Sequence, residues 1–308
     1  MEPSVSDFTF IMNPMAGKGA ARKVLAELER LLPGLGLGYE AVYTLRPGHA
    51  TEIARTCSSP HVIAVGGDGT INEAVNGIMG SGKVLGIIPT GSGNDLIKSL
   101  GIPRKLQAAL DVLRSGNVRR IDAGRVACGN LSTGSMQYAP GRYFINGVGI
   151  GFDASVARRV SEIGYLRGTL LYLVAVLQTL GHYKAPFLRV SVDGSTTVGK
   201  KLLIAIGNGK CAGGGFYLTP DAVVDDGALD VCAIQDLPVL KILRLIPSVM
   251  SGKRVEDPGV SYSRTTSITV ESAERLTVHA DGEVIGRDVF GVKVEVVAGS
   301  MLIIAPRV

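Results

Sequence analysis

The chain has 308 residues, 41 of them glycine, and carries a formal net charge of +5. Hydrophobic residues make up 46% of it, which is enough apolar surface to offset the entropy of folding, so a disordered chain is excluded. The basic residues form no long run, Trp is absent and aromatic residues make up only 5%. Because nucleic acids require basic stripes and stacking side chains, we expect no nucleic-acid partner.

No segment of the sequence has the pattern of a leader or a membrane anchor. Residues 1–14 lack the basic start and the apolar stretch of a signal peptide. The most apolar segment, residues 169–181, is shorter than the about 20 residues that a membrane-spanning helix needs. The four cysteines are widely spaced, which is typical of reduced thiols. We therefore expect a cytoplasmic protein without a transmembrane segment.

The first 120 residues alternate between strand and helix patterns. Short apolar runs predict strands at residues 8–12, 39–44, 61–65 and 84–88. Helical periodicity predicts helices at residues 20–32, 50–57, 71–79, 95–100 and 105–114. Strands separated by helices of this length indicate a doubly wound, mostly parallel sheet.

After about residue 121 strand patterns dominate, separated by Gly, Asp and Pro turns. Strands are expected at residues 143–145, 188–192, 202–206, 229–234, 267–270, 276–280, 293–297 and 301–304. Helices are expected at about 153–182 and 238–251, and an exposed loop at 129–141. This pattern predicts an antiparallel β-sandwich or barrel. We expect an α/β nucleotide-binding domain at 1–122 and a β-sandwich domain at 123–308, whose last strand can return to the first domain.

Three glycine-rich turns follow strands of the first domain, where ligands bind in α/β sheets. The first, residues 13–19, can turn backbone N–H groups toward an anion, with Lys18 adding a charge, or can be a tight connection. The second is Gly66-Gly67-Asp68-Gly69-Thr70. A carboxylate at Asp68 beside a phosphate makes sense if a divalent cation lies between them. The alternative is an Asp-Gly turn in which Thr70 caps the next helix.

The third turn, residues 89–96, places small, hydroxyl and amide side chains around Asp95. It offers further donors to phosphate and a second carboxylate for a metal. Neither the P-loop pattern nor the dinucleotide-binding glycine pattern occurs. The three turns together predict a nucleoside triphosphate that is held without a Walker lysine.

The Gly66–Thr70 motif, with Asn72 and Glu73 after it, resembles the nucleotide site shared by diacylglycerol, sphingosine and ceramide kinases, NAD kinases and phosphofructokinases. Further motifs narrow the resemblance to the bacterial soluble diacylglycerol kinase family. They are NPMAGKG at 13–19, PGHA at 47–50, PTGSGNDLIKSLGIP at 89–103, NGVGIGFD at 146–153, the glycine and DDGALDV stretch at 213–231, and HADGE at 279–283. The resemblance covers nearly the whole chain and implies an N-terminal domain like that of NAD kinase and phosphofructokinase.

The resemblance implies a role for each matching position. The implied ATP-contacting residues are Asn13, Pro14, Met15, Ala16, Gly17, Thr44, Gly66, Gly67, Asp68, Gly69, Thr70, Ile71, Asn72 and Ser92. Asp68, Lys18 and Asp95 match a polar network around the catalytic Mg²⁺ and the phosphates. Glu283 matches the general base, and Asp226, with the backbone near Val223 and Ala228, matches a structural magnesium site. Ser92 departs from the family by replacing a threonine, but it keeps the hydroxyl.

The residues themselves leave alternatives open. Glu283 suits a base that takes a proton from a lipid hydroxyl, yet Asp281-Gly282 is equally compatible with a hairpin turn that exposes Glu283. The acids at 225–226 suit Mg²⁺ or a solvated loop. The basic and apolar segment 153–183 can lie on a membrane or pack between domains.

We therefore expect an ATP- and Mg²⁺-dependent lipid kinase that converts diacylglycerol to phosphatidic acid at a membrane surface. The alternatives are a sphingoid base, ceramide or phosphatidylglycerol as acceptor, a soluble-metabolite kinase of the NAD kinase type, and a non-catalytic regulator with the same fold. Edge strands in the second domain are compatible with a homodimer.

Overall fold

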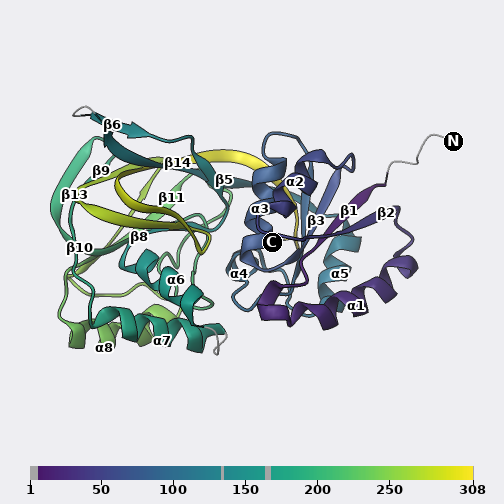
Figure 1. Ribbon diagram of the computed structural model, residues 1–308, viewed down its shortest axis with the longest axis horizontal. Coiled ribbons are helices and arrows are strands. Elements are labelled where there is room, and N and C mark those ends of the chain that lie inside the picture. Colours follow the sequence, from purple (N-terminus) through teal and green to yellow (C-terminus); the bar gives the residue numbers. More distant parts are fainter. Residues whose placement is uncertain (1–5, 133–134, 164–167, 308) are drawn as a thin grey trace. The chain divides into compact units, whose positions relative to one another are not determined.

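The computed structural model describes residues 6–132, 135–163 and 168–307. The chain divides into two compact units, Met1–Ile121 with Gly299–Val308, and Asp122–Ala298. Each unit has its own buried apolar cluster, and the strands of both units form one continuous pairing order. The prediction of an α/β region followed by a β-rich sandwich is confirmed (Figure 1).

The first unit contains a parallel sheet whose strands follow the order β2, β1, β3, β4 and the end of β14. Its other elements alternate with these strands along the chain. They are, with the strands, β1 (Phe8–Met12), the 3-10 helix η1 (Ala16–Gly19), α1 (Ala21–Leu31), the 3-10 helix η2 (Leu32–Leu35), β2 (Tyr39–Tyr43), α2 (His49–Thr56), β3 (His61–Gly66), α3 (Asp68–Ile78), β4 (Val84–Pro89), α4 (Asp95–Leu100) and α5 (Leu106–Ser115).

The central strands of this sheet are buried on both faces, which is why their sequences are apolar runs and not alternating patterns. On one face Ile63 and Val65 pack with α1 and α5, for example against Leu28 and Leu110. Helices α2 and α3 lie together on the other side of the sheet (Figure 1). This two-sided cover leaves the carboxyl ends of the strands as the place where polar turns gather.

The second unit is an antiparallel β structure, with strands in the order β12, β11, β10, β8, β13 and β14. Strand β9 pairs with β10 and β13, and β5 pairs with β6, β7 and β14. The elements are β5 (Val118–Ser132), β6 (Ser135–Tyr138), β7 (Arg142–Phe144), β8 (Gly147–Gly151), α6 (Phe152–Glu162), α7 (Gly168–Leu180), β9 (Phe187–Val192), β10 (Ser195–Gly207), β11 (Leu229–Gln235), α8 (Val239–Met250), β12 (Val260–Thr265), β13 (Ser267–Ala280) and β14 (Glu283–Ile304).

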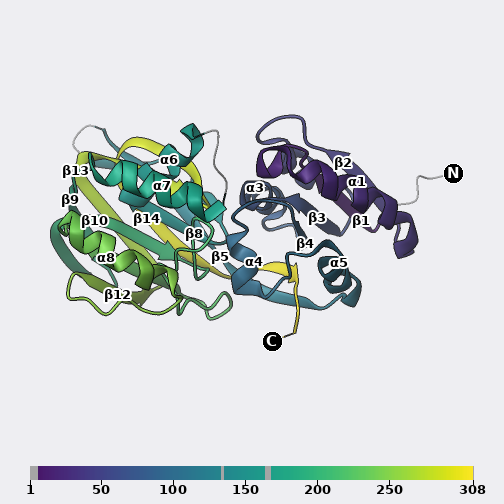
Figure 2. The ribbon, with the colours of Figure 1, turned by 90° about the horizontal axis from the view of Figure 1, so that it is seen from below.

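Helices α6, α7 and α8 lie along one face of these strands (Figures 1 and 2). A buried cluster that includes Phe152, Ala175 and Ile242 fills the layer between helices and strands. A second cluster, with Phe144 and Val278 among its members, forms the interior of the strand layers themselves. Within the described part of the chain, none of the helices is both long enough and apolar enough to cross a membrane.

Most predicted elements of the first unit are confirmed to within a few residues, whereas several in the second unit are wrong. The exposed loop expected at 129–141 is wrong, because β5 continues to Ser132 and pairs with β6. The strands expected at 267–270 and 276–280 are one bulged strand, β13, and those at 293–297 and 301–304 are one strand, β14. The helix expected at 153–182 is two helices, and residues 164–167 within it lie outside the described residues.

Candidate active site

The first glycine-rich turn is tied to the second by the side chain of Asn13. Its Nδ2 donates a hydrogen bond of 2.8 Å to Thr70 Oγ1, and its Oδ1 accepts one of 2.9 Å from the backbone N–H of Met15. The sequence left open that Thr70 caps α3, and the structure shows that it does not. Helix α3 already begins at Asp68, with Gly67 at the N-cap position, and Thr70 lies in its first turn.

The second turn is tied to the third by the carboxylate of Asp68. Its Oδ2 accepts the backbone N–H of Asn94 and its Oδ1 accepts that of Asp95, both at 2.8 Å. The Asp95 carboxylate in turn pairs with Lys98 at 2.8 Å. The Asp68 carboxylate is thus held against the backbone of Asp95 by N–H groups. A shared role of the two carboxylates at a metal stays a prediction.

The backbones of the second and third turns approach each other very closely at Gly67 and Gly91. A Cβ on Gly91 would lie 2.5 Å from the Cα of Gly67, a distance that real Cβ atoms do not show. Beside this contact, Thr90 Oγ1 and Asn94 Oδ1 are buried without a hydrogen-bond partner among the described residues. Unsatisfied buried acceptors are rare in proteins, so these atoms suit a polar ligand.

The other residues predicted to contact the nucleotide differ in how exposed they are. Met15 and Ser92 are exposed, and Thr44 is buried at the end of β2, where its N–H bonds to the carbonyl of Met12. Ile71 and Asn72 are buried within α3. Lys18 belongs to η1, but its side chain lies outside the described part of the structure.

Glu73 follows the Gly66–Thr70 motif, and the sequence predicted no role for it. Its carboxylate accepts the backbone N–H groups of Gly48 and Ala50, at 2.8 and 3.0 Å. It thereby joins the start of α2 to α3 and explains why Pro47-Gly48-His49-Ala50 accompanies the Gly66–Thr70 motif. The sequence order alone cannot show this contact, because 25 residues separate Gly48 from Glu73.

In the second unit, Glu283 begins β14 immediately after a two-residue turn. Ala280 pairs with Glu283 across this turn, and Asp281 and Gly282 have φ values of 48° and 85°. The hairpin that the sequence left open is therefore present. Glu283 is half-buried, and its Oε2 lies 2.5 Å from the guanidinium of Arg142 in β7.

Asp281 fixes this turn to the backbone between β7 and β8. Its buried carboxylate accepts three backbone N–H groups, those of Ile145, Asn146 and Gly147, each at 2.9 Å. Its own N–H bonds to the carbonyl of Gly147 at 2.8 Å. Hydrogen bonds to a carboxylate are among the stronger ones in proteins, so the backbone that carries Glu283 is held firmly.

The loop that contains Asp226 is organised by salt bridges and by a buried aspartate. Asp226 pairs with Arg264 and accepts the N–H of Ala228 at 3.1 Å, while Val223 is exposed. Asp122, which is 2% exposed, accepts the N–H of Gly227 at 2.7 Å. Since an arginine already satisfies the Asp226 carboxylate, a structural cation at Asp226, Val223 and Ala228 stays a prediction.

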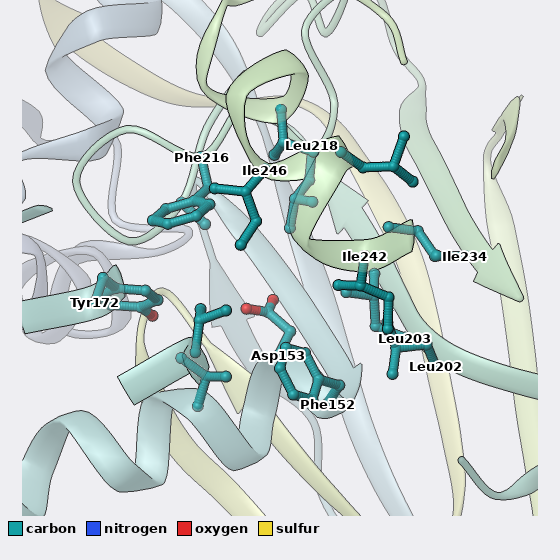
Figure 3. A pocket seen from close by; sticks show the side chains of 15 residues that line it. Phe152, Asp153, Tyr172, Leu202, Leu203, Phe216, Leu218, Ile234, Ile242 and Ile246 are labelled. Carbon is teal, nitrogen blue, oxygen red and sulfur yellow. The ribbon is translucent and has the colours of Figure 1, made fainter. Parts of the chain in front are cut away.

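The second unit also contains an apolar cavity between α6, α7, α8 and the strands (Figure 3). Its empty space, part of it open to solvent, is about 640 Å³. The side chains around it are aliphatic or aromatic except for Asp153, whose carboxylate points among them (Figure 3). The labelled lining residues include Tyr172, Leu203, Phe216 and Ile242.

Comparison with known proteins identifies the class of this site. Residues 7–126 match the diacylglycerol kinase catalytic domain, and residues 146–305 match the YegS C-terminal NAD kinase beta sandwich-like domain. Diacylglycerol kinases of Mycobacterium tuberculosis (strain ATCC 25618 / H37Rv) and Bacillus subtilis (strain 168) are 30% and 29% identical. The first alignment covers 91% of this chain and 89% of the relative, and the second covers 89% and 88%.

The protein is thus a kinase. The chain belongs to the diacylglycerol kinase family, a family of lipid kinases, as its sequence motifs predict. Solved structures agree on the fold. A diacylglycerol kinase from Bacillus anthracis str. Sterne superposes with a TM-score of 0.73 at 20% identity, covering 99% of this chain and 98% of that one. Yeast NADH kinase superposes with a TM-score of 0.56 at 13% identity, covering 99% and 85%.

Proposed function

We propose that this kinase transfers the γ-phosphate of ATP to the hydroxyl of a lipid, with diacylglycerol as the acceptor and phosphatidic acid as the product. The curated relatives that align over about nine-tenths of the chain carry the name diacylglycerol kinase. The observation that carries the proposal is that one chain combines the interlinked glycine turns with an apolar cavity and a held carboxylate, Glu283.

ATP is proposed to bind at the three glycine turns of the first unit. Backbone N–H groups at such turns and at the start of α3 provide positive potential for phosphates. The buried, unpartnered oxygens of Thr90 and Asn94 can accept hydrogen bonds from a nucleotide. Because Gly67 and Gly91 lack Cβ atoms, the second and third turns can lie directly against each other.

Mg²⁺ is proposed to accompany the nucleotide, held by Asp68 and Asp95. The described residues contain no group of three or more His, Cys, Asp or Glu that could hold a metal by itself. The two carboxylates of Asp68 and Asp95 suit Mg²⁺, which commonly takes one or two carboxylates and completes its shell with phosphate oxygens and water. When bound, the ion supplies positive charge that offsets the phosphate oxygens. Lys18 stays a predicted additional cation beside them.

Glu283 is proposed as the general base that accepts the proton of the lipid hydroxyl. The hydrogen bonds of Asp281 fix the backbone of its turn, and Arg142 fixes its carboxylate. A carboxylate that is held in one orientation favours proton transfer in the reactive geometry. Arg142 also keeps the negative charge of the base compensated while no substrate is bound.

The apolar cavity is proposed to receive an acyl chain of the lipid, because burial of methylene groups there is favourable by about 0.8 kcal/mol each. We further propose contact with the membrane surface, since α7 and α8 expose Leu177 and Leu240, and α8 also exposes Arg244. Such a surface suits the interface of a bilayer that contains anionic lipids.

The test is transfer of label from γ-labelled ATP to a panel of purified lipids in mixed micelles. We expect label in phosphatidic acid when diacylglycerol is present, and a strong dependence on added Mg²⁺. Preferential labelling of a sphingoid base, ceramide or phosphatidylglycerol would change the acceptor. Label confined to a water-soluble product such as phosphorylated NAD would contradict the proposal.

A substitution in the cavity tests the proposed acyl-chain site separately. Val176 lines it from α7, so Val176→Phe fills part of the space. We expect the KM for long-chain diacylglycerol to rise about three-fold to ten-fold, equivalent to about one methylene contact or two, while the KM for ATP stays constant. An unchanged KM for the lipid would place the acyl chain elsewhere.

A further inference from the structure

A buried, hydrogen-bonded pair of side chains lies next to the turn that carries Glu283. His279 in β13 is 3% exposed, and its Nε2 lies 2.8 Å from Oδ2 of Asp153 in α6. The same Asp153 lines the apolar cavity described above (Figure 3). Polar groups so deeply buried require partners, and each of these residues provides one for the other.

Gly149 makes room for this pair. In the antiparallel pairing of β8 with β13, Gly149 lies opposite His279. A Cβ on Gly149 would lie 2.2 Å from both Asp153 Oδ2 and His279 Nε2. Any other residue at this position would therefore push the carboxylate and the ring apart.

The second ring nitrogen of His279 reaches the turn itself. The backbone N–H of Gly282 donates a hydrogen bond of 3.3 Å to His279 Nδ1. Gly282 directly precedes Glu283 and lies in the left-handed region, with a φ of 85°. The turn is thus held at Asp281 by β8 and its neighbouring residues, and at Gly282 by the histidine ring.

We propose that His279 is a positioning residue for the proposed base: its ring, oriented by Asp153, holds the Gly282 N–H and thereby sets the place of Glu283. This inference rests on the proposed role of Glu283. Nδ1 accepts a hydrogen bond only in a ring that carries its single hydrogen on Nε2. The Asp153 carboxylate selects that tautomer because it accepts the Nε2–H group.

The charges around the ring make this arrangement sensitive to pH. Burial disfavours the charged imidazolium, but the charge and hydrogen bond of Asp153 and the charge of Asp281 outweigh it and raise the pKa of His279. The charge of Asp153 also acts on Cys232 in β11, whose thiol stays protonated because burial raises its pKa to about 12. When His279 is protonated, Nδ1 carries a hydrogen and the Gly282 N–H loses its acceptor.

The experiment compares two isosteric replacements in the labelled-ATP assay. His279→Gln can still donate to Asp153 but has no atom at the position of Nδ1. His279→Asn places its side-chain oxygen close to that position. We expect His279→Gln to lower kcat about ten-fold to a hundred-fold at a constant KM for ATP. We expect His279→Asn to keep a kcat much closer to that of wild type.

A third variant, Asp153→Asn, keeps a hydrogen-bond acceptor for Nε2–H but removes the charge. Because that charge raises the pKa of His279, we expect the acidic limb of the pH profile of kcat to move to lower pH. This readout does not depend on how well His279→Asn folds. Thermal unfolding of each variant shows whether the comparison is made between folded proteins.

Wild type and Glu283→Gln in the same assay separate the two proposals. If wild type labels no lipid, the proposed function is wrong. If wild type is active and Glu283→Gln is not, while His279→Gln keeps the kcat and pH profile of wild type, only the positioning role is wrong. Equal losses in folded His279→Gln and His279→Asn, with an unshifted profile in Asp153→Asn, would also overturn it, because that result marks a merely structural pair.

Discussion

The two units organise their polar groups in opposite ways. In the first unit, the turns are linked largely through backbone groups, as when the Asp68 carboxylate accepts the N–H groups of Asn94 and Asp95. In the second unit, long-range side-chain pairs such as Arg142 with Glu283 and Asp153 with His279 are added to backbone contacts such as those of Asp281. The turns of the first unit need glycines at positions close in the sequence, whereas the side-chain pairs of the second unit join residues far apart in the sequence.

This difference leads to different sensitivities. Substitutions in the glycine turns of the first unit are expected to change nucleotide binding together with turnover. They displace the backbone whose N–H groups are proposed to bind the phosphates. Substitutions around the Glu283 turn of the second unit are expected to change turnover and to leave nucleotide binding unchanged, because they move one carboxylate. The following variants test that contrast, beginning with the largest expected effect.

Asp68→Ala removes the acceptor of two backbone N–H groups and one proposed ligand of Mg²⁺. We expect kcat/KM to fall about a hundred-fold to a thousand-fold, the magnitude typical for loss of a group that stabilises transition-state charge. Steady-state kinetics with varied ATP and Mg²⁺ measure it, and calorimetry measures ATP binding. Full activity with unchanged ATP affinity would contradict the view that Asp68 joins the turns.

Gly91→Ala tests the close approach of the second and third turns. Its Cβ would lie 2.5 Å from Gly67 Cα, so the two turns must move apart. We expect ATP to bind about ten-fold more weakly, since the backbone N–H groups of the two turns would no longer point at the same phosphates. Gly34→Ala is the matched control, because no atom lies within 4 Å of its added Cβ and its φ is not positive. Equal effects of the two variants would refute the close-packing argument.

The buried pair of the second unit predicts a dependence of stability on pH. The pKa of His279 is raised in the folded protein, so its contribution to stability is present below the unfolded pKa of about 6.5 and is lost as pH rises through the folded pKa. Thermal unfolding of wild type is therefore expected to show a loss of stability over that rise. Asp153→Asn should reduce this pH dependence.

Activity is expected to follow the opposite course, because only the neutral ring accepts the Gly282 N–H. Turnover should increase with pH over the interval in which stability declines. Parallel changes of stability and turnover would contradict the proposed link between His279 and Glu283. The effect operates through one hydrogen bond, of 3.3 Å, from the Gly282 N–H to His279 Nδ1.

The contrast between the units also explains what the sequence could predict. The parallel sheet, the helices around it and the three turns were predictable because apolar runs and glycines are local features, as in His61–Gly66 followed by Gly67. The start of α3 was misplaced because Asp68 and Gly69 are poor indicators of helix interior, although Asp suits the first turn. There, the contact of Thr70 with Asn13 decides the role of the hydroxyl.

The second unit was less predictable because its contacts join distant residues. Glu283 lies 141 residues from Arg142, and His279 lies 126 residues from Asp153. Strand β8 is rich in glycine, which is depleted in strands, and β6 is only four residues long, so neither gives a strong local strand signal. The role proposed for Glu283 came from the family motif, whereas its contact with Arg142 could only be seen in the folded chain.

The central claim is that Glu283 acts as the base toward a lipid hydroxyl, while ATP binds independently in the first unit. The most direct measurement is label transfer from γ-labelled ATP to diacylglycerol by wild type and Glu283→Gln, with ATP binding measured in parallel. We predict that Glu283→Gln lowers labelling of phosphatidic acid at least about a hundred-fold and leaves the ATP affinity unchanged. Equal labelling by the two proteins would contradict the claim.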